Sequence, residues 1–156
     1  MELDVLKNSF ESLRKKHSLP SFDELNDSFD IGKIETNSGN FMRDIRRTMM
    51  EKIVHYIRLA ELMINPSQGS PIFFVLLREI TPADRKVVDG VFQSFVSLEL
   101  ASYKLDVGYD EKGEVAFIKT ILSTWKETKP SVIALLTVLE RNWHSNQKKN
   151  EKAYFS

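Results

Sequence analysis

The chain has 156 residues, 42% of them apolar, and its 22 lysines and arginines balance its 22 aspartates and glutamates. This length and composition suit one domain with a hydrophobic core, and the balanced charge excludes a global field that would draw the protein to nucleic acid or to an anionic membrane. The absence of cysteine excludes disulfides, cysteine-ligated metals and thiol nucleophiles, and it suits either a reducing cytosol or a hot one.

The first 35 residues predict two short helices. The opening residues are acidic and amphipathic, unlike a signal peptide, and apolar residues recur at spacings of three and four up to Pro20. This spacing predicts a first amphipathic helix with Leu3, Leu6, Phe10 and Leu13 on one face. Ser21 followed by Glu24 has the spacing of a capping box, which predicts the start of a second helix.

A long helix is predicted over residues 38–64, ending before Asn65-Pro66, and it would run about 40 Å. Its apolar residues share one face at 100° per residue. That face carries Met42, Ile45, Met49, Ile53, Tyr56, Ile57, Ala60, Met63 and Ile64.

The rest of the chain also shows helical periods. Residues 71–80 are apolar on every side and predict a buried helix, with a strand as the weaker alternative. A proline and a cap separate this segment from a long helix over 82–105. Further helices are predicted over 114–127 and 131–145, with a polar tail of weak periodicity over 146–156. The expected fold is all-α: an irregular antiparallel bundle of six or seven helices in one domain, 1–145, around the central long helix.

Three arginines lie on one flank of the long helix, and they have two interpretations. Arg43, Arg47 and Arg58 stand beside acidic residues at helical spacing, which favours an ordinary solvated face. Alternatively, this flank and the basic tail would form a nucleic-acid surface. The tail residues concerned are Lys148, Lys149 and Lys152.

Two charged residues fall inside apolar faces. Arg46 lies within the apolar stripe of the long helix, and Glu99 lies near the centre of a broad apolar face on the helix after Pro82. A charge in such a place must be paired, neutralised or exposed to a cavity. We expect Arg46 and Glu99 to form an inter-helix ion pair that fixes helix register, or else to line a small-ligand pocket.

The same helix carries a row of small residues, Gly90, Ser94, Ser97 and Ala101. Such a row lets another helix approach closely. The approaching helix is either a neighbour within the chain or, if the row is a self-association surface, a second copy.

No cofactor, metal or catalytic motif is predicted. Glu51 and His55, like Glu140 and His144, lie one turn apart, but this spacing is not the Glu-x-x-His of di-iron bundles. Neither a Gly-rich phosphate loop nor a hydrolytic triad is evident in the sequence.

The segments LPSFDELNDSFDIGKIE and RDIRRTMMEKIVHYIRLAEL resemble the opening of small, uncharacterised all-helical proteins from archaea. The resemblance implies a helical fold and a cytoplasmic location, and it transfers no functional residues. We therefore expect a non-enzymatic interaction or scaffolding module that self-associates through helix faces. The alternatives are a nucleic-acid accessory protein and a small-ligand-binding bundle.

Overall fold

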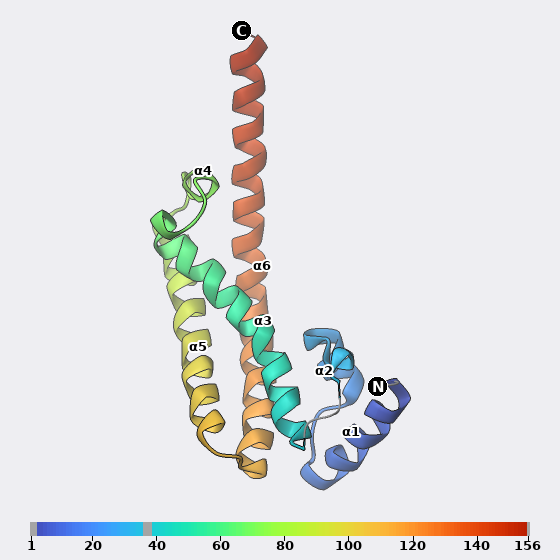
Figure 1. The fold of residues 1–156 in the computed structure, drawn as a ribbon. Coiled ribbons are helices and arrows are strands. Elements are labelled where there is room, and N and C mark those ends of the chain that lie inside the picture. The colour runs from blue at the N-terminus through green and yellow to red at the C-terminus, as the bar shows by residue number, and fades with distance from the viewer. Residues whose placement is uncertain (1–2, 36–38, 156) are drawn as a thin grey trace. The chain divides into compact units, whose positions relative to one another are not determined.

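The computed structural model describes residues 3–35 and 39–155, and all regular secondary structure in these residues is helical (Figure 1). The predicted all-α bundle is confirmed. The helices in chain order are α1 (Leu3–His17), α2 (Phe22–Phe29), α3 (Phe41–Ile64), α4 (Ile72–Leu76), α5 (Pro82–Val107) and α6 (Glu111–Phe155), with short 3-10 helices η1 (Ile31–Lys33) and η2 (Pro66–Gln68).

The chain forms two compact units. The first comprises Met1–His55 and Val96–Trp125, and the second comprises Tyr56–Phe95 and Lys126–Ser156. Helices α3, α5 and α6 each continue from one unit into the other without a break. Each unit is therefore built from segments that are distant in the sequence.

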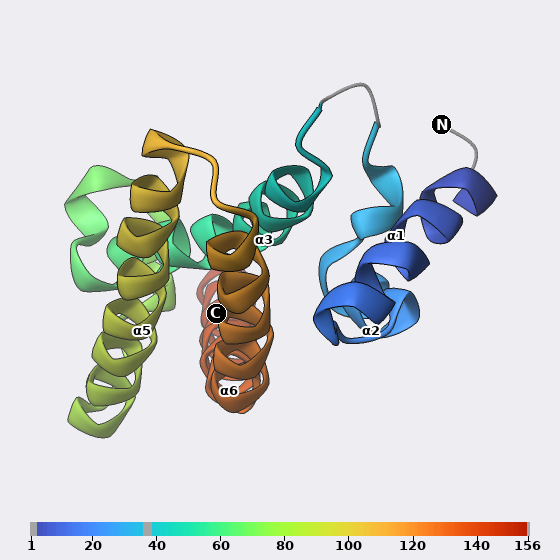
Figure 2. The ribbon, with the colours of Figure 1, turned by 90° about the horizontal axis from the view of Figure 1, so that it is seen from below.

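In the first unit, α1 and α2 pack side by side (Figure 2). The side chain of Ser21 accepts a hydrogen bond of 3.2 Å from the backbone N–H of Glu24, so the predicted cap is present. Phe10 and Phe22 meet edge to face with ring centroids 5.7 Å apart, which joins the buried faces of the two helices.

Helix α3 carries the predicted apolar stripe and ends at Ile64, as expected; its predicted start at residue 38 lies outside the described residues. In the first unit this stripe is fully buried at Met42, Ile45, Met49 and Ile53. The assignment of Ile64 to the stripe is wrong, because this last side chain of α3 is exposed.

The prediction of a buried helix over 71–80 is wrong. Only five residues, Ile72–Leu76, form α4, and none of them is fully buried. This helix of little more than one turn, in the connection between α3 and α5 of the second unit, leaves Ile72 and Phe74 exposed. Asn142 of α6 donates a hydrogen bond of 2.7 Å to the carbonyl of Leu76, which satisfies a group at the end of α4.

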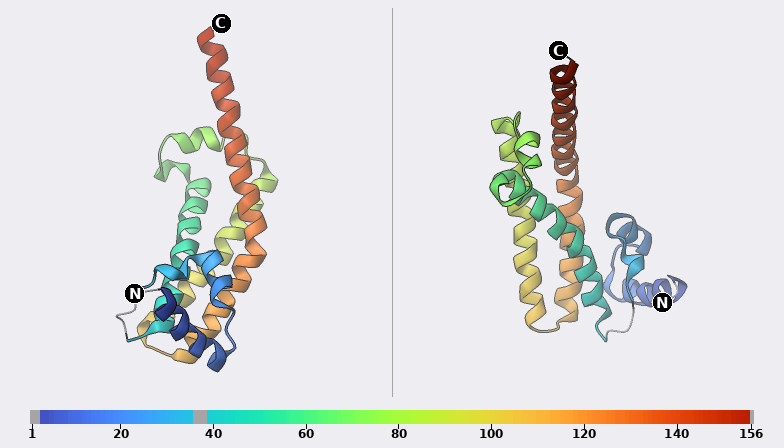
Figure 3. Two further views of the ribbon diagram at one scale, coloured as in Figure 1. Left: turned by 90° about the vertical axis from the view of Figure 1, so that its right-hand side faces the viewer. Right: turned by 45° about the horizontal axis from the view of Figure 1, so that its top comes forward.

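The predicted break between two helices near residue 130 is also wrong, because α6 includes Pro130 and is one helix. Figure 3 shows its ribbon as a single coil. A proline inside a helix removes one hydrogen bond and costs about 3 kcal/mol or more. Buried residues nevertheless keep one helical phase across it, since Trp125 and Val132 are seven residues, or about two turns, apart. Burial of both sides therefore outweighs the local cost.

The segment 146–155, predicted as a polar tail, continues α6 as helix; Ser156 lies outside the described residues. Lys149 on this segment forms an ion pair of 3.3 Å with Glu79. Among the described residues, no helix combines the length and apolar character needed to cross a membrane.

Candidate functional site

Arg46 is the largest fully buried side chain of the described residues, with 0% of its surface exposed. The sequence predicted this location, because the residue lies within the apolar stripe of α3 in the first unit. A buried guanidinium is stable only if its charge is compensated and its five N–H groups find acceptors.

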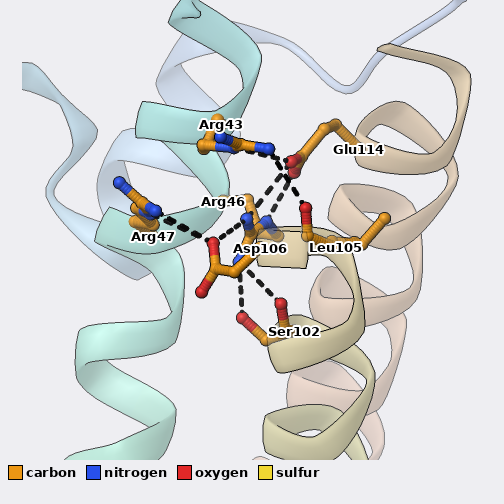
Figure 4. Close-up of polar contacts among 7 residues, drawn as sticks. All are labelled: Arg43, Arg46, Arg47, Ser102, Leu105, Asp106 and Glu114. Atoms are coloured by element: carbon orange, nitrogen blue, oxygen red, sulfur yellow. Dashed lines mark hydrogen bonds and ion pairs between the residues drawn. The ribbon is translucent and has the colours of Figure 1, made fainter. Parts of the chain in front are cut away.

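All five N–H donors of Arg46 have acceptors on α5 and α6 (Figure 4). Nε donates to Glu114 at 2.5 Å, and Nη2 donates to Glu114 at 3.2 Å and to Asp106 at 2.7 Å. Nη1 donates to the hydroxyl of Ser102 at 2.6 Å and to its backbone carbonyl at 3.2 Å. One side chain of α3 thus links α5 and α6 within the first unit.

The prediction that Arg46 forms an ion pair with Glu99 is wrong. Glu99 is half-buried at the edge of the packed face of α5 and accepts a hydrogen bond of 2.9 Å from the hydroxyl of Tyr103. The acidic partner is Glu114, which is 0% exposed and belongs to the first turn of α6. A signal for Glu114 was present, since it continues the buried row of Ile118, Ile121 and Trp125 at spacings of four, three and four.

The flanking arginines, Arg43 and Arg47, belong to one polar cluster with Arg46, Ser102, Asp106 and Glu114. Arg43 donates to Glu114 at 3.5 Å and to the carbonyl of Leu105 at 3.1 Å, and its guanidinium lies 5.4 Å from the centre of the Tyr109 ring. Arg47 forms an ion pair of 3.0 Å with Asp106. Two of the three arginines proposed for nucleic acid are therefore already paired with carboxylates.

Electrostatic interactions in the cluster favour the charged forms of Asp106 and Arg46. The hydrogen bond from Arg46, followed by the one from Arg47, holds the pKa of Asp106 below its ordinary value. Burial alone would lower the pKa of Arg46, but its hydrogen bonds to Glu114 and Asp106 outweigh burial and raise the pKa. The pKa shifts of Arg46 and Asp106 therefore both favour the charged form of the group concerned.

The cluster has the properties of a structural contact that holds α3, α5 and α6 together in the first unit. Neither Arg46 nor Glu114 is reachable by solvent, and every Arg46 donor is used. A small-ligand site would require an open donor or acceptor facing a cavity. The buried cluster therefore gives the small-ligand interpretation no support at Arg46.

The remaining basic residues proposed for binding nucleic acid do not form one group. Arg58 lies on α3 in the second unit, where it lines a pocket together with Glu61. Lys148 and Lys152 are exposed on α6, whereas Lys149 between them is paired with Glu79.

A surface that the sequence analysis missed lies on the outward side of α5 in the first unit. We define the outer face of α5 as Val96, Leu100, Tyr103 and Val107. Leu100 and Tyr103 are each 59% exposed and Val107 is 90% exposed, while Val96 is half-buried. Their 4-3-4 spacing was visible in the sequence, but the opposite, buried side of α5 is apolar as well and concealed it.

The predicted small-residue row lies along one flank of this helix. Gly90, Ser94 and Ser97 are exposed and Ala101 is half-buried. A Cβ atom added at Gly90 would meet no atom of another helix within 4 Å, so among the residues that the structure describes no neighbouring helix makes a close approach there. The intramolecular interpretation of the row thus finds no support at Gly90, and self-association stays a prediction.

The second unit has a pocket of about 270 Å³ between the end of α3 and the start of α5, lined by polar as well as apolar side chains. Met63, Leu77, Ile80 and Val88 are among the side chains that line it. Among the described residues, no group of three or more histidine, aspartate or glutamate side chains could hold a metal ion.

Comparisons of the chain with models of protein families, with curated proteins and with solved structures found no significant match. The resemblance of the first 65 residues to archaeal helical proteins therefore stays a prediction. Any functional assignment has to rest on the surfaces and the cluster described above.

Proposed function

We propose that this protein is a non-enzymatic interaction module that self-associates through the outer face of α5. The observation that carries the proposal is the exposed apolar row of Leu100, Tyr103 and Val107, at a regular helical spacing. Single exposed apolar residues are ordinary on protein surfaces, whereas a contiguous row of them on one helix face is typical of an interface.

The buried cluster supports this proposal by giving α5 a rigid support. Ser102 is buried on the same two turns of α5 that carry Leu100, Tyr103 and Val107 outward, and both Ser102 and the partly exposed Asp106 accept hydrogen bonds from Arg46. A helix held in place before binding loses little conformational entropy when a partner docks on it. The cluster thus prepares the surface, and function follows from packing rather than from chemistry.

The two alternatives have less support. Binding of nucleic acid needs cations that are available to phosphates, and Arg43 and Arg47 are paired with Glu114 and Asp106. Binding of a small ligand at Arg46 needs access to solvent, which that side chain does not have.

The test is sedimentation velocity on the purified chain over a range of concentrations. We expect a concentration-dependent shift from monomer to a larger species, because an apolar row of four residues makes a small, weak interface. Leu100→Gln should shift this equilibrium toward monomer while leaving the far-ultraviolet circular dichroism unchanged, since the side chain is exposed.

A matched control is Ile133→Gln, which changes an aliphatic side chain of similar exposure, 53%, on α6 in the second unit. It should leave the association unchanged. A wild-type chain that stays monomeric at the highest concentration, or equal effects of the two substitutions, would contradict the proposal.

A further inference from the structure

We infer that the partner on the outer face of α5 is a second copy of this chain, packed with its α5 parallel to the first, and that Glu99 and Lys104 form the ion pairs across the contact. The inference rests on the proposed function and adds the orientation and the charged residues that select it.

Glu99 and Lys104 flank the outer face on opposite sides. At 100° per residue, the mean direction of the four apolar residues lies about 70° from Glu99 on one side and about 70° from Lys104 on the other. Lys104 is exposed, and it makes no hydrogen bond or ion pair with any other residue that the structure describes. It is therefore available to a partner.

Glu99 is also in position for such a contact. The hydroxyl of Tyr103, itself a member of the outer face, donates to Oε1 of Glu99 at 2.9 Å, and this hydrogen bond holds the carboxylate at the border of the face. The second carboxylate oxygen can still accept a bond, because an ionised carboxylate has about four acceptor sites.

Charge distinguishes the two ways in which two copies can pack about a two-fold axis. In a parallel pair the axis runs along the helices, and the left flank of one copy meets the right flank of the other. Glu99 then meets Lys104 of the partner subunit, five residues farther along, which is the spacing of the ion pairs beside the seam of parallel coiled coils. Symmetry makes this pair twice.

An antiparallel pair brings like flanks together instead. Glu99 would face Glu99 of the partner subunit, and Lys104 would face the partner's Lys104. Like charges opposed across an interface are unfavourable, so the charge pattern selects the parallel arrangement.

The residues that precede Val96 on this face of α5 limit the length of the apolar contact. The outer-face positions that precede Val96 are occupied by Lys86, Asp89 and Gln93, which are polar. The apolar contact therefore covers three turns, from Val96 to Val107. A contact of this length matches the weak association that the proposed function expects.

Because the chain has no cysteine, single introduced cysteines can report whether the two α5 helices of the dimer are parallel or antiparallel. In a parallel pair, residue 107 lies opposite residue 107 of the other copy, so Val107→Cys alone should form a disulfide-linked dimer under mild oxidation. In an antiparallel pair the two residues would lie roughly 16 Å apart, and a disulfide would form only when Val96→Cys and Val107→Cys chains are mixed. Ile133→Cys controls for random collision of exposed thiols.

Charge reversal tests the ion pairs. Glu99→Lys or Lys104→Glu alone should weaken the dimer about tenfold, because each places two like-charged pairs at the contact, and the double reversal should restore wild-type affinity. Both residues lie outside the buried core, so circular dichroism and melting temperature of each variant serve as the folding control.

The outcomes separate the inference from the proposed function. Cross-linking of Val107→Cys alone and rescue by the double reversal support the inference. Association that Leu100→Gln abolishes, but that cross-links only in the mixed Val96→Cys and Val107→Cys sample, overturns the parallel orientation and leaves the proposed function standing. A chain that is monomeric throughout overturns both.

Discussion

The replacement Glu114→Gln tests the central claim about the buried cluster. Glu114 is 0% exposed and accepts two hydrogen bonds from Arg46, which is itself 0% exposed. The amide keeps the size of the side chain but removes its charge, and it leaves Asp106 as the one remaining anion that contacts Arg46. Breaking a buried pair typically costs 3–5 kcal/mol, and the remaining Asp106 places our expectation at about 3 kcal/mol.

The assay is thermal unfolding followed by circular dichroism, with Glu99→Gln as the matched control. For a chain of this size about 3 kcal/mol corresponds to a fall in Tm of roughly 6–12 °C. Glu99→Gln should change the Tm by little, because Glu99 contacts Tyr103 at a half-buried edge and not Arg46. Equal effects of the two replacements would refute the reasoning, and a larger effect at Glu99 would restore it as the partner of Arg46.

Two further changes probe the cluster and α6. The pKa of Asp106 is lowered in the folded state, so its stabilisation is present above its unfolded pKa of about 3.9 and is lost as the pH falls through the lowered value. The difference in Tm between wild type and Asp106→Asn should therefore be constant at neutral pH and shrink below about pH 4; a difference that grows there would contradict this sign. Pro130→Ala should raise the free energy of unfolding by about 2 kcal/mol, because it restores a hydrogen bond inside α6, and urea denaturation showing a loss would contradict it.

The helical fold and the buried arginine were predictable from local patterns. The end of α3 before Pro66, the cap at Ser21 and the burial of Arg46 each depend on spacing within a single helix, which the sequence displays directly. Such features need no knowledge of which helices are neighbours.

The partner of Arg46 could not be derived in the same way. In the structure the buried apolar residues of α5 are Val88, Val91, Phe95 and Leu98, and at 100° per residue Glu99 lies at one edge of this group rather than near its centre. Which carboxylate meets Arg46 depends on how α3, α5 and α6 come together in the first unit. That packing is tertiary information, and the periodicity of one helix does not contain it.

The errors at α4 and Pro130 have a common cause. Each prediction relied on a local rule. For α4 the rule was that a segment apolar on all sides is buried, and for Pro130 it was that proline ends a helix. At Pro130 the rule is overridden by the burial of Trp125 and Val132 on either side, and at α4 it fails because five residues are too few to be enclosed.

The separation of Arg46 from Glu114 along the chain affects how the protein is made. The two residues are 68 positions apart, so at a ribosomal rate of about 5–20 residues per second Glu114 is added roughly 3–14 s after Arg46. During that interval α3 can form as a helix but cannot bury its arginine without leaving an uncompensated charge. We therefore expect residues 41–55 of the nascent chain to keep their apolar stripe exposed to solvent until the turn that joins α5 to α6 has emerged.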